Sequence, residues 1–187
     1  MDVESIYPNF DHAEGIEASK IFLDQRRNKT FPTDRLLTIM KLILKSNVMT
    51  FGTRIFQQIK GTAMGTPMAV SYANIFMNWY ENNMLSEYQK LYNKKPNTWL
   101  RFIVYIFFVW SGDEKSLKHF LTFCNNFSNE YKLKSSIKFT YTYSEKEVNF
   151  LDTKVEIEDN GSLSTNLYCK PSSAHQYQNK RSSHPPH

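Results

Sequence analysis

Residues 60–77, KGTAMGTPMAVSYANIFM, constrain the fold of this chain more than any other stretch. Two glycines, Gly61 and Gly65, precede the pair Thr66-Pro67, and a long segment without Gly or Pro follows. Because Thr is a favourable N-cap and Pro a favourable first helical residue, the pattern predicts a loop that leads into a helix. Glycines before a helix can leave N–H groups free to face an anion, and the plain alternative is a turn before a core helix.

Hydrophobic periodicity and turn residues predict the other elements. We expect helices over residues 12–25, 35–45, 68–92 and 113–131, with the second of them wedged into the core. Strands or hairpins are expected over residues 1–10 with a turn at Pro8-Asn9, 47–59 with a turn at Gly52-Thr53, 98–110, 137–143, 148–157 and 163–169, the last after a turn at 159–161.

The composition is that of a folded domain with a mild basic excess. Of the 187 residues 41% are hydrophobic and 15% aromatic, and the net charge is +5, which fits contact with phosphate groups. We expect no membrane partner and an intracellular location, nucleus or cytoplasm, since no stretch resembles a membrane span or a secretory signal. Cys124 and Cys169 lack metal-ligand spacing, and we expect free thiols.

The sequence of residues 60–77 resembles the third conserved block of the reverse transcriptase palm, and it is close to the form of this block in Penelope-like retroelements. Residues 2–18, DVESIYPNFDHAEGIEA, resemble the first palm block. The resemblance implies that Asp2 is the carboxylate that holds catalytic Mg²⁺, and that Tyr7 lies under the sugar of the incoming nucleotide. It also implies that template and nucleotide contact Lys60, Gly61, Gly65, Thr66 and Pro67.

Residues 98–110, TWLRFIVYIFFVW, resemble the active-site hairpin of that family, whose bend carries an Asp-Asp pair. Here Val104 and Tyr105 take those two positions. Two-metal nucleotide transfer needs hard oxygen ligands, whereas Val offers no donor atom and Tyr, with a reference pKa of about 10, is a neutral phenol. Only Asp2 remains of the carboxylate set, so we expect the chain to be catalytically inactive. The resemblance also predicts that Asp2 and this bend lie on adjacent strands.

We therefore expect an α+β fold over residues 1–169, a partial reverse transcriptase palm with an antiparallel sheet backed by helices. The chain begins one residue before Asp2, and we expect the fingers and thumb to be largely missing, so that exposed palm surface favours self-association. Residues 170–187 form a basic, His-rich tail. This tail is either a disordered end or a weak nucleic-acid contact through Lys170, Lys180 and Arg181.

Three interpretations of the function remain open from the sequence. The resemblance implies RNA-templated DNA synthesis on an RNA template and a DNA primer, with the chemistry lost at Val104-Tyr105. The alternative is a non-catalytic remnant of a retroelement that binds nucleic acid. The third is a relic without function.

Overall fold

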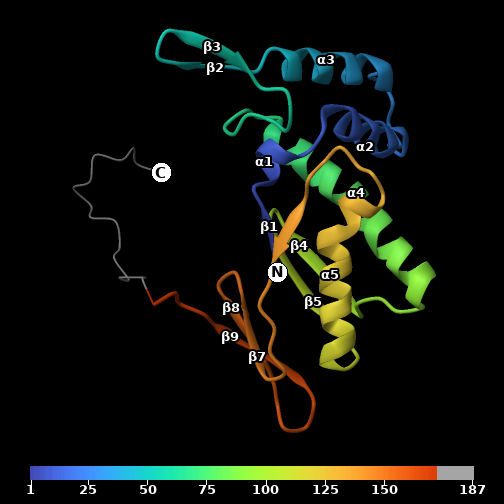
Figure 1. Cartoon of the computed structure of the whole chain (residues 1–187), viewed down its shortest axis with the longest axis vertical. Coiled ribbons are helices and arrows are strands. Elements are labelled where there is room, and N and C mark those ends of the chain that lie inside the picture. Colours follow the sequence, from blue (N-terminus) through green and yellow to red (C-terminus); the bar gives the residue numbers. More distant parts are fainter. Residues whose placement is uncertain (172–187) are drawn as a thin grey trace. The chain divides into compact units, whose positions relative to one another are not determined.

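Strand β1 (Asp2–Glu4) lies in the middle of a four-stranded sheet with the order β4-β5-β1-β6 (Figure 1). Its neighbours are β5 (Tyr105–Val109) and β6 (Lys138–Thr140), and β4 (Thr98–Phe102) forms the far edge. Every neighbouring pair in this sheet is antiparallel. It follows that β1 and β4 run parallel to each other, with β5 inserted between them.

Two long helices complete this unit. Helix α4 (Ala69–Tyr92) precedes β4, and α5 (Glu114–Glu130) connects β5 to β6. The resulting connectivity is a β-α-β-β-α-β arrangement in which a hairpin strand is inserted between two parallel strands. This confirms the expected mixture of helices with an antiparallel sheet.

The computed structural model describes residues 1–171, which divide into two compact units, 1–141 and 142–171. The second unit is a three-stranded antiparallel sheet of β7 (Glu147–Phe150), β8 (Thr153–Ile157) and β9 (Leu163–Leu167). The sequence prediction of one strand over 148–157 is wrong, because Leu151 adopts a φ of 55° and turns the chain back.

The core of the first unit lies between the four-stranded sheet and helices α4 and α5. One face of α4 is fully covered, which confirms the predicted apolar stripe of this helix. Alternation along the strands sends Val3, Ile106 and Phe139 into the same core. The principal core residues from the two helices are Tyr72, Ala73, Phe76, Met77, Tyr80, Met84, Tyr88, Phe120, Phe123, Cys124 and Phe127.

The N-terminal helices lie against α4. Helix α1 (Ile6–Asn9) replaces the turn predicted at Pro8-Asn9, and α2 (His12–Asp24) begins where the sequence predicts. The Asp11 carboxylate caps α2 by accepting hydrogen bonds from the N–H groups of Ala13 and Glu14.

Helix α3 (Thr33–Lys45) corrects the sequence prediction of a helix wedged into the core. Only Leu37 and Leu44 are buried, whereas Ile39 and Leu42 are 47% and 65% exposed. Within residues 1–171, α3 packs by one face against α2, and nothing covers its outer face. Apolar residues all round a helix therefore did not mean burial all round.

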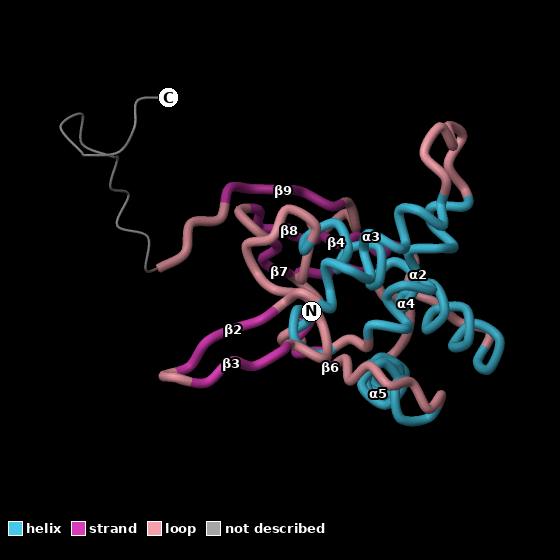
Figure 2. The backbone as a smooth tube through the Cα atoms, turned by 90° about the horizontal axis from the view of Figure 1, so that it is seen from above, coloured by secondary structure: helices cyan, strands magenta, loops and turns pink. Residues whose placement is uncertain are grey.

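The hairpin of β2 (Val48–Phe51) and β3 (Arg54–Gln57) follows α3 and turns at Gly52-Thr53, as predicted. It forms a two-stranded sheet of its own and extends away from the helices (Figures 1 and 2). All eight of its strand residues are exposed.

Strand β6 forms the edge of the four-stranded sheet opposite β4, and it is shorter than predicted. Asn125 of α5 lies beside its outer edge, where the Asn125 amide donates to the Phe139 carbonyl at 3.0 Å and accepts from the Phe139 N–H at 2.8 Å. The side chain of Asn125 thus occupies the place that a neighbouring strand would take.

Candidate functional site

The first site predicted from the sequence is the pairing of Asp2 with the β4–β5 bend. Asp2 lies directly opposite Tyr105 in the antiparallel ladder. The Val3 N–H donates to the Val104 carbonyl at 2.8 Å, and the Ile106 N–H donates to the Met1 carbonyl at 2.7 Å. The prediction that Asp2 and this bend lie on adjacent strands is confirmed.

The oxygen donors at this place do not fit a two-metal centre. Besides Asp2, the same face of β1 carries Glu4, which lies opposite Lys138. Strand alternation could have revealed Glu4, which the sequence analysis did not single out. Among residues 1–171, no three side chains of His, Cys, Asp or Glu come together as a metal-binding group. Because Val104 has no donor atom and Tyr105 is a phenol, the residues at this bend do not fit a magnesium ion.

Directly behind the bend lies a buried ion pair that the sequence analysis missed. The Arg101 Nε lies 3.0 Å from both carboxylate oxygens of Glu81 on α4. The Arg101 guanidinium also donates to the Asn74 side-chain oxygen at 2.6 Å, the Asn74 carbonyl at 3.1 Å and the Ile103 carbonyl at 3.0 Å. A lone Arg in an otherwise apolar strand is the signal that could have indicated this pair, since a buried charge needs a partner.

Burial controls the charge state of Glu81. Desolvation raises the pKa of this carboxyl above its usual value of 4.5, while the positive charge and hydrogen bond of Arg101 act in the opposite direction. Both side chains are nearly buried, with 12% exposed for Arg101 and 8% for Glu81. Arg101 therefore ties the bend to α4 and also compensates the buried carboxylate.

The bend itself has an unfavourable backbone conformation. Ile103 adopts a φ of 54°, in the left-handed region that β-branched residues rarely enter. Its carbonyl is the one that accepts from Arg101. The ion pair and the ladder to β1 thus hold a turn that the sequence of the hairpin alone would disfavour.

The glycine loop contacts the segment that contains Tyr7. The Gly61 N–H donates to the Phe10 carbonyl and the Thr62 N–H to the Tyr7 carbonyl, both at 2.7 Å. Of the two readings that the sequence left open for this loop, the Gly61 N–H therefore favours the turn before a core helix over a group free to face an anion. Gly61 has a φ of 69°, and a Cβ there would overlap the Tyr7 carbonyl oxygen, so close packing of two backbones requires this glycine.

The rest of this loop also differs from its predicted role. Helix α4 begins at Ala69, so Thr66 is not its N-cap and Pro67 is not its first residue. Instead, the Ala69 N–H closes a turn onto the Thr66 carbonyl at 3.0 Å, with Pro67 inside it, and the Thr66 hydroxyl donates to the Ala63 carbonyl at 3.1 Å. Gly65, with a φ of 89°, faces open space.

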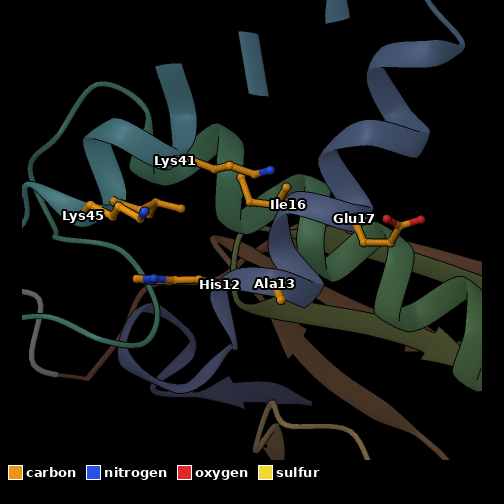
Figure 3. Close-up of a pocket in the computed structure, with 7 residues that line it drawn as sticks. His12, Ala13, Ile16, Glu17, Lys41 and Lys45 are labelled. Carbon is orange, nitrogen blue, oxygen red and sulfur yellow. The ribbon is translucent and has the colours of Figure 1, made fainter. Parts of the chain in front are cut away.

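Two basic features lie near this loop. Lys60 donates to the Lys134 carbonyl at 3.2 Å. A hollow of about 310 Å³ lies between α2 and α3, and Figure 3 shows its lining residues His12, Lys41 and Lys45 together with the acidic Glu17. A ring nitrogen of His12 lies 2.8 Å from the Gly61 carbonyl oxygen, which places the hollow next to the glycine loop.

The C-terminal residues proposed for nucleic-acid contact are only partly described. Lys170 is exposed, whereas Lys180 and Arg181 lie outside the described residues. Cys124 and Cys169 are both free thiols, as expected, and burial raises the pKa of the Cys124 thiol. No helix within residues 1–171 combines the length and apolar character that a membrane span requires.

Comparison with models of protein families, with curated proteins and with solved structures finds no match to this chain.

Proposed function

We propose that this chain is a reverse-transcriptase-like palm of the Penelope-like type that does not catalyse nucleotide transfer. The observation that carries the proposal is the pairing of Asp2 with Tyr105, beside the Val104 bend. In the family that the sequence resembles, two catalytic aspartates occupy the positions of Val104 and Tyr105. A third carboxylate comes from the first palm block, at the position of Asp2.

The contact between two separate sequence blocks supports the proposal. Tyr7 and Phe10 belong to the first block that resembles the palm, and Gly61 and Thr62 belong to the third. Backbone hydrogen bonds join these residues although about 50 positions separate them in the chain. The β-α-β-β-α-β sheet with both long helices on one face agrees with a palm as well.

The chemistry of the donor set supports the absence of catalysis. Two metal ions about 3.5–4 Å apart need several anionic oxygens between them. Asp2 and Glu4 project from one face of the short strand β1, and Glu4 lies opposite the cationic Lys138. Neither residue replaces a carboxylate at the bend, because both belong to β1, whereas the bend lies between β4 and β5.

Restoration of the carboxylates tests the proposal. We place residues 1–171 in a chimera with the fingers and thumb of an active reverse transcriptase, and compare it with the same chimera carrying Val104→Asp and Tyr105→Asp. We expect primer extension with Mg²⁺ from the restored chimera alone. A second control, Val104→Asn with Tyr105→Asn, matches the size of the new side chains without their charge and is expected to stay inactive.

Two results would contradict the proposal. Extension by the unsubstituted chimera at a rate comparable with the restored one would show that the bend is not the cause of inactivity. Inactivity of the restored chimera, with a melting transition that matches the unsubstituted one, would show that the site is not a palm active site. The melting comparison is needed because added carboxylates repel each other when no metal is bound.

We also propose that the chain binds nucleic acid without catalysis, because a specific charge pattern favours it. Between residues 35 and 80 there is no Asp or Glu, while five basic residues occur there: Arg35, Lys41, Lys45, Arg54 and Lys60. A segment with basic residues and no acid of its own attracts a polyanion, and binding then weakens steeply as salt rises because counterions are released. Absence of binding to any RNA or DNA at low salt would contradict this second proposal.

A further inference from the structure

The β2–β3 hairpin has two faces of different chemical character. Directly opposite residues in its ladder are Met49 with Phe56 and Phe51 with Arg54. Because opposite residues of an antiparallel pair point to the same side, these four side chains share one face, which we call the aromatic hairpin face. The other face carries Val48, Thr50, Ile55 and Gln57.

The aromatic hairpin face is open to solvent. Phe51 is 81% exposed, Met49 56% and Phe56 45%. An isolated two-stranded hairpin is marginally stable in water, and large apolar side chains displayed on one mark a binding surface. Within the described residues, the hairpin is tied to the helices only at its base, for example by the Gln57 amide, which donates to the Lys45 carbonyl at 2.8 Å.

The segment that carries this face has basic residues and no acidic ones. Among residues 1–171, no acidic side chain pairs with Arg54, and the whole acid-free segment from 35 to 80 surrounds it in the sequence. Lys41 and Lys45, which line the hollow between α2 and α3, belong to the helix whose last turn anchors the hairpin. The partner of this face therefore combines negative charge with flat apolar rings.

These two properties together are those of a single nucleic-acid strand. Its bases expose their faces, which a duplex hides by stacking, and each base adds a phosphate. Stacking of bases on aromatic side chains tolerates any sequence, and Arg contributes both to phosphate binding and to stacking. An apolar protein partner would match the phenylalanines but would gain nothing from the absence of acid.

We propose that the aromatic hairpin face binds a single strand of nucleic acid, with bases stacked on Phe51 and Phe56 and a phosphate held by Arg54. This inference rests on the proposed nucleic-acid binding and assigns it to a surface. Since stacking does not read the 2′-hydroxyl, RNA and DNA strands bind this face with similar affinity.

The test measures binding of the full chain to labelled oligothymidylate and oligouridylate of about 15 nucleotides by fluorescence anisotropy at low salt. Phe51→Ala and Phe56→Ala are each expected to weaken binding by about 5- to 100-fold. Val48→Ala and Ile55→Ala are matched controls, because they remove exposed apolar side chains from the opposite face. We expect these controls to change the affinity by less than about twofold, and Phe51→Tyr to keep it.

Arg54 has a separate readout. Arg54→Gln is expected to make the plot of log affinity against log salt shallower by about 0.7, the value for one phosphate contact on a single strand. Arg54→Lys is expected to keep the slope. An unchanged slope for Arg54→Gln would remove Arg54 from the site.

Other results would overturn the inference in distinguishable ways. If the unsubstituted chain binds but the Phe51 and Phe56 variants bind equally well, the assigned surface is wrong and the proposed nucleic-acid binding stands. If Ile55→Ala weakens binding as much as Phe51→Ala, the folded hairpin and not its aromatic face is needed. If neither oligonucleotide binds but an RNA–DNA duplex does, the single-strand assignment fails and the proposed nucleic-acid binding stands; if none of the three binds at low salt, both proposals fail. If sedimentation shows a dimer that Phe51→Ala dissociates, and no strand competes with it, the face joins two copies of this chain.

Discussion

The first unit contains two tight hairpins that look alike in sequence and differ in structure. β2–β3 and β4–β5 are both rich in apolar and aromatic residues, and each turns through two residues, the first with a positive φ: 60° at Gly52 and 54° at Ile103. Yet β4–β5 is built into a four-stranded sheet, whereas β2–β3 pairs with no further strand among the described residues.

The difference shows that surroundings, rather than local sequence, decide how a hairpin is held. β4–β5 tolerates Ile at an unfavourable φ because Arg101 holds the Ile103 carbonyl and β1 pairs with the second strand. β2–β3 has Gly at the equivalent position and needs no such support. One hairpin is thus fixed by partners within the chain, and the other displays its side chains to solvent.

The largest expected effect comes from removing the charge that holds the β4–β5 hairpin. Arg101→Met leaves Glu81 buried without a cationic partner, and we expect the free energy of unfolding to fall by about 3–5 kcal/mol. Urea unfolding followed by Trp fluorescence reports on this unit, which contains all three Trp residues. The double variant Arg101→Met with Glu81→Leu is the control, and we expect it to recover most of the loss.

The pH dependence of the same variant sharpens this prediction. Burial raises the pKa of Glu81 above the 4.5 expected for the unfolded chain, so the folded state holds this proton more tightly. The stability that protonation of the Glu81 carboxyl contributes is complete below pH 4.5, and it is lost as the pH rises through the pKa of the folded state. Without Arg101 the pKa rises further, so the deficit of Arg101→Met should shrink as the pH falls toward 4.5. A deficit that does not change with pH would show that lost packing, and not the charge, is responsible.

A matched pair of isoleucines, one in each hairpin, tests whether the two hairpins differ in how firmly they are packed. Ile106 of β5 is 1% exposed and Ile55 of β3 is 74% exposed. Ile106→Ala is expected to lower the free energy of unfolding by about 2–5 kcal/mol, because it leaves a cavity in the core. Ile55→Ala is expected to change it by less than about 0.5 kcal/mol. Similar losses for both variants in urea unfolding would mean that the β2–β3 hairpin is packed in solution.

The smallest effect on global stability is expected from Gly52→Ile. This substitution gives the first turn position of the β2–β3 hairpin the same residue type that Ile103 provides in the β4–β5 hairpin. A left-handed conformation costs a β-branched residue about 1–2 kcal/mol, enough to open a marginal hairpin. Amide hydrogen exchange should show lost protection in β2 and β3, while the urea midpoint changes little. Protection that persists in Gly52→Ile would show that contacts hold this hairpin as firmly as the other.

The sequence predicted the elements of this fold better than their surroundings. Apolar periodicity located α4 and α5, and the turn residues located the β2–β3 bend, because these signals are local. The burial of α3 was predicted wrongly, since Ile39 and Leu42 are as apolar as core residues and only the packing of other elements decides their exposure. For the same reason, apolar composition could not distinguish the hairpin that joins a larger sheet from the one that pairs with no further strand among the described residues.

The candidate site shows the same division. Adjacency of Asp2 and Tyr105 followed from the resemblance, and the register agrees with it. The Gly61 N–H bonds to the Phe10 carbonyl, which only the folded chain brings near, whereas Thr66 was wrongly predicted as the N-cap because it forms a local turn with Ala63 and Ala69 instead. The Arg101–Glu81 pair joins a strand to a helix 20 positions earlier, a distance over which no periodicity indicates a contact.

Asn125 has a consequence for how this protein behaves at high concentration. Within β6, Phe139 is the residue whose N–H and C=O both point away from β1, and the Asn125 amide binds both groups. An edge strand with free backbone groups is a template onto which a strand from another molecule can add. One carboxamide thus ends the sheet at the β6 edge, and addition of a strand from another molecule at this edge is blocked by a side chain rather than by a charge or a proline.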